Sequence, residues 1–421
     1  MIVNASGTGG FFGGVTQFYN TATAGRATFV NRASPAGGSL GATYFWDNST
    51  AGDATLIAEG SGNSDLSGSF VFNGGSGGNA TLIAGAATAA GGFGGAIVFT
   101  NSSTAGNSTL IGQGGTTAGA RGGLIQIAGS ASGGRARAVL DAVINGGSSA
   151  ELDISGLNVG GTAVGSIEGG GIVTLGSKNL RVGENSATFS GLIRDRAGNL
   201  ATGGSLTVIG ASALTPTGAN TYTGATRIGD GINANSGKLN AHNVAGSATG
   251  AGPVFVERGG TLGGSGFIAG PVTLRAGGTI APGDPVTLTL HDSLIWDGGS
   301  VIRLVLGANS AGSDHLELGA LIRGTDGKFR FDFVDLGIVA GKSYELIHFE
   351  SIFGFGASDF SFSGVAGNFN VENGRLDFTA AAVPEPSAAW LLVAGMLFLI
   401  VAQRRTAGLP GLFKRIPARN D

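Results

Sequence analysis

The sequence has 421 residues but no cysteine, only ten prolines and four histidines, and its charged residues make up just 12% of the chain. The absence of cysteine excludes disulfide bonds and any zinc or thiol chemistry that depends on cysteine. Five of the 24 basic residues lie in residues 403–421, and the rest of the chain is mildly acidic. Such a body lacks the basic patch that nucleic-acid binding requires, so we expect no nucleic-acid partner.

Glycine is the residue that the chain has in excess. There are 82 glycines, roughly three times average usage, and they lack the regular spacing of collagen. Disordered glycine-rich chains are poor in apolar residues, whereas 42% of this chain is hydrophobic. These residues come in short bursts such as TLI, FVF and AIVF, bounded by glycine, asparagine and serine. Such bursts indicate strands and tight turns, so we predict an all-β fold.

A repeat of about 27 residues runs through residues 16–142, and each unit has an apolar burst, a small-residue turn and a second burst. The turns carry nearly the same residues at 24–28, 51–55, 77–81 and 105–109. The first bursts are 27, 26, 27 and 27 residues apart and centre on Phe18, Phe45, Val71, Val98 and Ile125. The second bursts centre on Phe29, Leu56, Leu82, Leu110 and Val139.

This repeat predicts a stacked β-solenoid. One unit cannot bury its own apolar face, whereas stacked coils bury a continuous core and pair each strand with the next coil. We therefore expect the first bursts to line up along one wall, with two or three short strands in each coil. The alternative is a sandwich of β-hairpins, which the regular period disfavours. Four turn asparagines are expected to form ladders between coils: Asn48, Asn73, Asn101 and Asn107.

From residue 170 the period loosens, but strand and turn signals continue. The stretch 203–231, which includes Leu214 and the run 218–224, resembles the passenger-associated β-strand repeat of autotransporters, as do GGTLGGSGFIAG at 259–270 and GGTIAPGD at 277–284. The resemblance covers roughly residues 170–380. It implies a right-handed parallel β-helix, but no particular activity, because this fold hosts many functions.

Residues 388–402 form an apolar run of fifteen residues without a charge. As a helix the run would be about 22 Å long, shorter than the ~30 Å hydrocarbon core of a bilayer, but flanking Trp390 and the following arginines can extend it. The alternative is a buried core helix. The terminal position, the apolar residues on every face and the cationic flank favour a single transmembrane helix with its basic end in the cytoplasm. The anchor residues are Trp390, Leu391, Leu392, Leu397, Phe398, Leu399 and Ile400, and the positive stop is Arg404 and Arg405.

The residues before this run complete a second resemblance. The motif Val383, Pro384, Glu385 and Pro386, followed by the apolar run and two arginines, resembles the PEP-CTERM sorting signal of Gram-negative bacteria. The prolines keep the motif extended and accessible to a processing enzyme. The resemblance implies three things: an exosortase-type enzyme as a partner, the inner membrane as the anchor before processing, and the cell surface or extracellular matrix as the destination. A chance proline-rich linker before a simple anchor is the alternative.

These features divide the chain into five segments. We expect glycine-rich solenoid repeats over 1–145, autotransporter-like repeats over 146–300, a β-rich passenger-like segment over 301–382, a sorting and anchor signal over 383–405 and a basic cytoplasmic tail over 406–421. An exported protein needs a signal peptide, yet residues 1–14 have neither a basic region nor an apolar one. Either the true start lies upstream of Met1, which we expect, or export uses another route.

Signals for chemistry are weak. No histidine has another histidine at metal-ligand spacing, so we predict no metal site and no cofactor. Asp314, His315 and Glu317 cluster in sequence, but strand alternation separates Asp314 from His315 by face, which argues against a catalytic dyad. The acidic residues of the second repeat have no equivalents in the next one and are interpreted as solvated turn residues: Asp47, Asp53, Glu59 and Asp65.

Three functions remain open. The PEP-CTERM resemblance implies a non-enzymatic exported surface or matrix protein, linked to exopolysaccharide or biofilm. The first alternative is an adhesin that binds a glycan or a host surface, which an exposed row of aromatic residues would support. The second is a polysaccharide-acting β-helix enzyme, which needs acidic residues that converge on one face.

Overall fold

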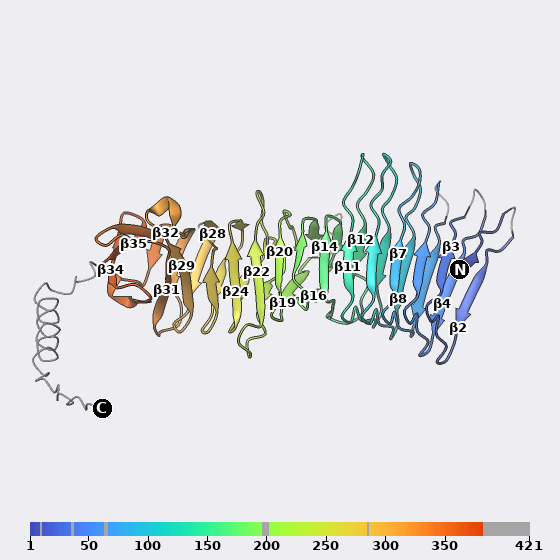
Figure 1. Cartoon of the computed structure of the whole chain (residues 1–421), viewed down its shortest axis with the longest axis horizontal. Helices are drawn as coiled ribbons and strands as arrows, with labels where there is room; N and C mark the ends of the chain where they lie inside the picture. The colour runs from blue at the N-terminus through green and yellow to red at the C-terminus, as the bar shows by residue number, and fades with distance from the viewer. Residues whose placement is uncertain (9–10, 35–37, 63–65, 196–201, 284–285, 382–421) are drawn as a thin grey trace, which may run out of the picture. The chain divides into compact units, whose positions relative to one another are not determined.

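The computed structural model describes residues 1–8, 11–34, 38–62, 66–195, 202–283 and 286–381. Residues Met1–Ala380 form one compact unit, an all-β solenoid of right-handed type with about 13 turns (Figure 1). Helix is almost absent from the described residues, where it is limited to two short 3-10 turns, η1 (Ser310–Gly312) and η2 (Ala357–Asp359). The predicted solenoid is confirmed, and the alternative sandwich of hairpins is wrong, because neighbouring strands are parallel nearly throughout.

One sheet runs the whole length of the solenoid. Within the described chain this first sheet has 15 strands. They are β1 (Ile2–Asn4), β3 (Thr28–Asn31), β5 (Thr55–Ala58), β7 (Thr81–Ala84), β9 (Thr109–Gly112), β11 (Arg137–Leu140), β14 (Ser166–Gly169), β17 (Ala187–Phe189), β20 (Ala213–Pro216), β22 (Gly237–Ala241), β24 (Gly260–Gly264), β27 (Thr279–Ala281), β29 (Val301–Leu306), β31 (Phe329–Asp335) and β33 (Phe360–Ser363).

The opposite wall is built from two further sheets. The second sheet holds β2 (Val15–Phe18), β4 (Ala42–Trp46), β6 (Ser69–Asn73), β8 (Ala96–Thr100), β10 (Leu124–Ile127), β12 (Glu151–Asp153), β15 (Ile172–Thr174) and β18 (Leu192–Arg194). The third sheet holds β13 (Gly161–Ala163), β16 (Asn179–Val182), β19 (Ser205–Val208), β21 (Thr226–Ile228), β23 (Val254–Val256), β25 (Phe267–Ile268), β26 (Val272–Leu274), β28 (Thr287–Trp296), β30 (His315–Arg323), β32 (Ser343–Phe353), β34 (Gly367–Glu372) and β35 (Arg375–Ala380).

The second sheet gives way to the third in the middle of the solenoid. The coils that begin with β12, β15 and β18 each contribute one strand to all three sheets. The later coils contribute strands only to the first and third sheets. The third sheet continues a ladder of single bridges in the first coils, which joins Thr23, Thr50, Ser76, Thr104 and Ser132. The next coil places β13 against the end of this ladder, because the Gly133 N–H donates to Thr162 Oγ1 at 2.8 Å.

The corners of the first coils require left-handed backbone at two positions in each coil. One position is taken by Asn20, Asp47, Gly74, Asn101 and Gly129, and the other by Gly25, Gly52, Gly78, Gly106 and Gly134, all with positive φ. Asparagine, aspartate and glycine adopt this conformation at the least cost. The N–H of the second-position glycine donates to the hydroxyl two residues earlier, for example from Gly52 to Thr50 Oγ1 at 3.1 Å. The repeated turn sequence thus sets the corner of each coil.

The core of the first coils is a stack of phenylalanines. Phe18, Phe45, Phe72 and Phe99 pair in register on consecutive coils, with ring centroids 4.7, 4.6 and 4.5 Å apart and nearly parallel planes. We expected Phe45, Val71, Val98 and Ile125 to form this wall, and that expectation is wrong after Phe45. The residues in register with Phe45 lie one position after Val71, one after Val98 and two after Ile125. Val71 pairs with Tyr44 and is only half-buried, and Ile127, not Ile125, continues the phenylalanine column. Successive side chains of a strand point to opposite faces, so the central residue of an apolar burst is not always the one that points into the core.

The second bursts are closer to expectation. Phe29, Leu56, Leu82 and Leu110 pair in register and are buried. The last member of the column is Ala138, because Val139 pairs with Ile111 and is half-buried. The asparagine ladders are confirmed in part, since Asn101 donates to Asn73, and Asn107 donates to Asn79 Oδ1 at 3.3 Å.

The described C-terminal end of the solenoid differs from the rest. There β35 pairs antiparallel with both β32 and β34, so a hairpin closes the third sheet. Phe378, which is fully buried, packs on Phe333 and Phe369 with ring centroids 4.5 and 5.3 Å apart. The hairpin therefore covers the last coil with aromatic side chains.

Among the described residues, no helix is both long and apolar enough to cross a membrane. The expected transmembrane helix at 388–402 and the sorting motif at 383–386 lie outside those residues, as do Arg404 and Arg405. These expectations therefore stay predictions.

Candidate ligand-binding groove

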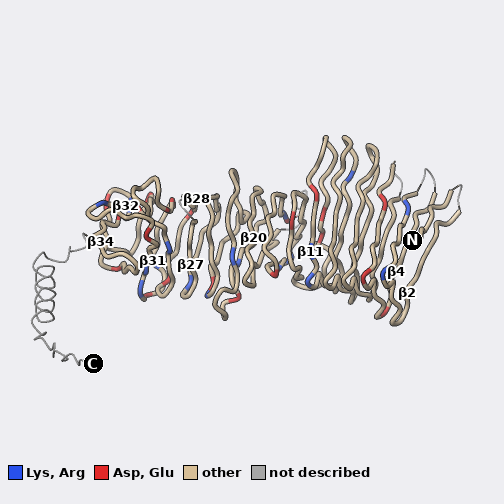
Figure 2. The backbone as a smooth tube through the Cα atoms, viewed as in Figure 1, with Lys and Arg blue, Asp and Glu red and all other residues tan. Residues whose placement is uncertain are grey.

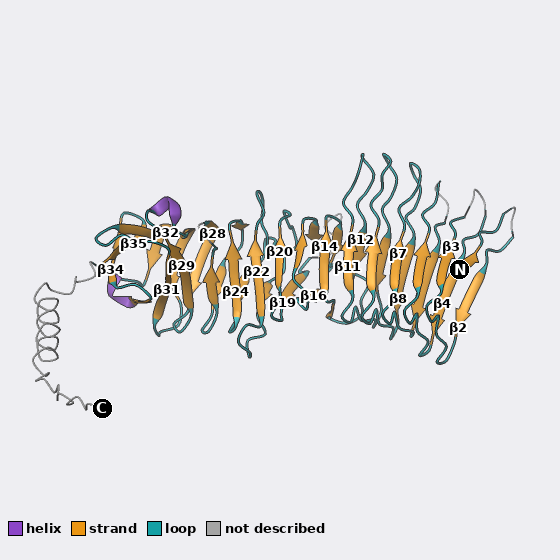
Figure 3. Cartoon of the chain, in the orientation of Figure 1, coloured by secondary structure: helices purple, strands orange, loops and turns teal. Residues whose placement is uncertain are grey.

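A groove lies at the base of the loops that lead from the first sheet to the second. These loops, at 85–95, 113–123 and 141–150, extend beyond the strands in the first half of the solenoid (Figure 3). The groove has a volume of about 420 Å³ and takes residues from four consecutive coils. With coils ~4.8 Å apart, four coils extend the groove about 14 Å along the solenoid axis.

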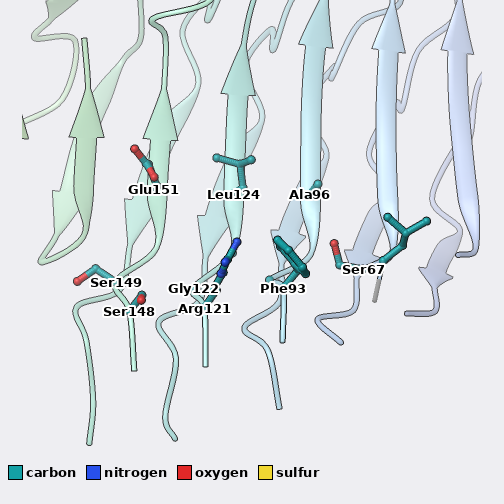
Figure 4. A pocket seen from close by; sticks show the side chains of 12 residues that line it. Ser67, Phe93, Ala96, Arg121, Gly122, Leu124, Ser148, Ser149 and Glu151 are labelled. Atoms are coloured by element: carbon teal, nitrogen blue, oxygen red, sulfur yellow. The ribbon is translucent and has the colours of Figure 1, made fainter. Parts of the chain in front are cut away.

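One wall of the groove is the start of the second-sheet strands. Ala96, Leu124 and Glu151 pair in register on β8, β10 and β12, so their side chains form a row along the axis (Figure 4). All three are half-buried. This wall therefore changes from apolar to acidic along its length.

Glycines form the floor because the coils approach too closely there for a side chain. A Cβ at Gly94 would lie 2.0 Å from the Gly122 carbonyl oxygen, and one at Gly122 would lie 2.3 Å from that of Ser149. A Cβ at Gly123 would meet the Ala84 carbonyl oxygen at 2.0 Å. The groove is thus a consequence of tight coil packing at a loop-to-strand corner.

The other wall carries Leu66, Phe93 and Arg121. The Arg121 guanidinium lies over the Phe93 ring, 4.2 Å from its centroid (Figure 4). The backbone of Phe93 is held from the preceding coil, since its N–H donates to Ser61 Oγ at 2.8 Å and its carbonyl accepts from the Ser61 N–H at 2.8 Å. Ser67 and Ser148 add hydroxyl groups to the lining. This wall combines an aromatic face, a cation and hydroxyls on a fixed backbone.

Of the two charged side chains that line the groove, Glu151 has an ion-pair partner and Arg121 has none among the described residues. Glu151 accepts a hydrogen bond from Thr174 and forms an ion pair with Arg194 at 3.3 Å. Arg121 has no ion pair with any described residue. Elsewhere acidic and basic residues are interspersed along the solenoid (Figure 2), so the unpaired Arg121 gives this groove a local excess of positive charge.

Two adjoining hollows on the third sheet share Glu317 and His348. One of them also holds His315 on β30, and the other holds His291 on β28. Glu317 stands opposite His348 in register and 3.9 Å from His315 Nε2, and Glu345 Oε1 lies 3.1 Å from His348 Nδ1. No group of such residues in the described ranges can hold a metal ion. Sequence spacing missed this cluster because its members come from different coils.

The remaining candidate residues are structural. Asp314 is buried, and its carboxylate accepts hydrogen bonds from the N–H groups of Val286 and Val305, both at 2.9 Å, while the His315 ring contacts Thr287. The separation of Asp314 from His315 is therefore confirmed. Asp53 lies in a turn, where it accepts from Asn79 at 3.2 Å.

An aromatic group on the surface of the first two coils combines the exposed Tyr19 with the half-buried Tyr44 and Trp46. Trp46 stacks on Tyr19 and on Tyr44, with centroids 6.3 and 5.9 Å apart, whereas Phe45 between them is buried in the core. The rings stack on one another, so part of each face is already covered. We interpret this group mainly as packing between coils.

No family model matches the chain, and no curated protein matches it significantly in sequence. The two family resemblances therefore stay predictions from the motifs.

Proposed function

We propose that this chain is a non-enzymatic exported protein of the bacterial surface or extracellular matrix, and that its solenoid associates with exopolysaccharide through the groove of Phe93 and Arg121. The observation that carries the proposal is the shape and lining of the groove. It is open, runs along the axis over four coils, and presents hydroxyl groups beside an aromatic ring, one face of which is in contact with Arg121. A linear groove with aromatic and polar lining suits an extended sugar polymer, whose rings have apolar faces and hydroxyl edges.

The route to the surface is part of the same proposal and rests on the C-terminal sequence. The apolar run at 388–402 anchors the chain in the inner membrane as a single helix, with Arg404 and Arg405 in the cytoplasm. An exosortase-type enzyme processes the chain at the motif of Pro384 and Pro386. Replacing both prolines with alanine in the producing cell should leave the chain at its full mass in the membrane. If the variant is still shortened to the same size as the wild-type chain, the assigned motif is contradicted.

Retention on exopolysaccharide tests the binding function. The full chain should be retained saturably on extracellular polysaccharide purified from the producing bacterium, without release of reducing sugar. Phe93→Ala should weaken retention roughly tenfold, which corresponds to about 1.4 kcal/mol. Phe362→Ala is a matched control, because Phe93 and Phe362 are 38% and 40% exposed but only Phe93 lines the groove. Equal loss in the two variants, or no retention of the folded chain, would count against the proposal.

The second candidate function is a polysaccharide-acting enzyme, which the hollows around Glu317 favour. Glu317 lines two adjoining hollows, which it shares with Glu345 in one and with Glu350 in the other, and both hollows also hold histidines. Converging acids are what glycoside hydrolysis requires. If this function holds, the chain releases reducing sugar from polysaccharide, and Glu317→Gln abolishes the release while Glu372→Gln, on the exposed face of β34, does not.

A further inference from the structure

We propose that the groove binds an anionic linear glycan, and that Arg121 binds a carboxylate of the polymer. This inference rests on the proposed function and adds the chemical class of the ligand. The candidate polymer is a polyuronate, in which each sugar carries one carboxylate, or a polymer with such sugars at intervals.

The first step of the argument is the pairing of arginines on this solenoid. Most described arginines form an ion pair, and most of these pairs join neighbouring coils, as Arg137 does with Glu168, Arg227 with Glu257 and Arg303 with Asp332. Arg121, like Arg258, is among the described arginines that no described carboxylate pairs with, and of these two only Arg121 lines the groove. Its charge is free to attract a ligand.

The second step is the orientation of the guanidinium. Its central carbon lies 4.2 Å from the centroid of the Phe93 ring (Figure 4), and no described residue accepts a hydrogen bond from its side chain. Arginine presents its N–H donors at the edge of the plane in a fork that matches a carboxylate. The contact with Phe93 therefore occupies one face of the guanidinium and leaves the donors at its edge for the ligand.

The third step is the opposite wall, which determines where the anion can lie. Glu151 would repel a carboxylate, and its own charge is already balanced by Arg194 at 3.3 Å. A polymer carboxylate therefore belongs on the Arg121 side, with the sugar ring over the glycine floor at Gly122. The hydroxyls of Ser67, two coils before Gly122, and of Ser148, one coil after it, lie in the same lining, where they can contact sugar hydroxyls.

Polygalacturonate and its methyl ester test the assignment, because the two polymers share a backbone and the ester replaces each carboxylate with a neutral methyl carboxylate. Binding of each polymer to the full chain is measured by titration calorimetry at neutral pH and low salt. We expect at least tenfold tighter binding of the free acid, and we expect that difference to shrink as salt is raised. Arg121→Gln should abolish the preference, and Arg121→Lys should keep only part of it, since lysine retains the charge but not the planar fork.

Arg258→Gln provides the matched control. Arg258 is exposed and has no ion pair with a described residue, but it lies outside the groove, so its loss should change affinity less than twofold. Equal binding of the two polymers by the wild-type chain overturns the anion assignment and leaves the proposed function standing. A preference that survives in Arg121→Gln, or binding of neither polymer, also overturns the assignment. The retention experiment above decides the proposed function separately.

Discussion

Two buried serines in the first coils lie where neighbouring coils place alanine or glycine. Ser108 falls in register between Ala80 and Ala136, and within the described residues the hydroxyls of Ser103 and Ser108 have no hydrogen-bond partner. A buried hydroxyl without a partner costs free energy that alanine avoids. The alanine column shows that a methyl group fits this position.

Ser108→Ala should therefore raise the free energy of unfolding by about 1 kcal/mol. Urea or thermal unfolding monitored by circular dichroism measures the change. Ser76→Ala is the control, because Ser76 Oγ accepts a hydrogen bond from the Gly78 N–H at 3.1 Å and its loss should destabilise the corner. Destabilisation by Ser108→Ala would show that this hydroxyl has a partner.

The phenylalanine column gives a test of the register at the same scale. Phe72 is fully buried between Phe45 and Phe99, while its neighbour Val71 points to the outer face and is half-buried. Phe72→Ala should cost about 3–5 kcal/mol of unfolding free energy, and Val71→Ala about 1 kcal/mol or less. If urea unfolding shows equal losses of unfolding free energy in the two variants, Val71 lies in the core, as the sequence had indicated.

At the scale of strands, ion pairs join neighbouring coils on the outer surface. Partial burial alone would raise the pKa of Glu168 on β14, but hydrogen bonds from Arg137 on β11 and from Ser166 outweigh it, so the pKa lies below its usual value. Partial burial of Asp332 on β31 is likewise outweighed, by Ser363 and Arg303, and the pKa of Asp332 is also lowered. Both carboxylates connect adjacent strands of the first sheet.

These lowered pKa values fix the sign of an acid effect. A carboxylate whose folded-state pKa is depressed stabilises the fold above its unfolded value, near pH 4, and this contribution is lost as pH falls through the folded pKa. We expect the free energy of unfolding to decrease from about pH 5 to pH 3 by roughly 0.5 kcal/mol for each pair. Glu168→Gln should remove the contribution of one pair from this pH dependence, and urea unfolding at several pH values measures the change. An unchanged pH dependence in that variant would contradict the assignment.

At the scale of the solenoid unit, the hairpin of β34 and β35 protects the last coil. Without it, β32 would present an unpaired edge, and Phe333 on β31 would lose the cover of Phe378. Exposed edges of sheets pair with other chains. The antiparallel hairpin therefore limits end-to-end association at this end of the solenoid.

Phe378→Asp should open this cap, because it places a charge where the side chain is fully buried. The expected result is concentration-dependent self-association, measured by light scattering and size-exclusion chromatography. Phe353→Asp is the matched control, since Phe353 is 57% exposed at the end of β32, and it should leave the chain in its original state. Association of both variants to the same extent would indicate a general effect of the added charge.

The sequence by itself determined that this chain stacks short strands into coils. The small-residue turns recur every 26–28 residues at Gly25, Gly52, Gly78, Gly106 and Gly134, and they need no distant partner to adopt positive φ. The apolar bursts between them are too short to form a core alone, so stacking follows from local residues. The second-burst column of Phe29, Leu56 and Leu82 followed from the same spacing.

Only the tertiary structure decided which residue of each burst points inward and which side chains meet on the surface. The choice of Phe72 over Val71 depends on pairing with Phe45 of the coil before, because alternation along one strand allows either face to be the core. Phe93 and Arg121 lie 28 residues apart on different loops, and His315 and His348 are on different strands. Coil-to-coil register brings these residues together, and that register is set by packing across the whole coil.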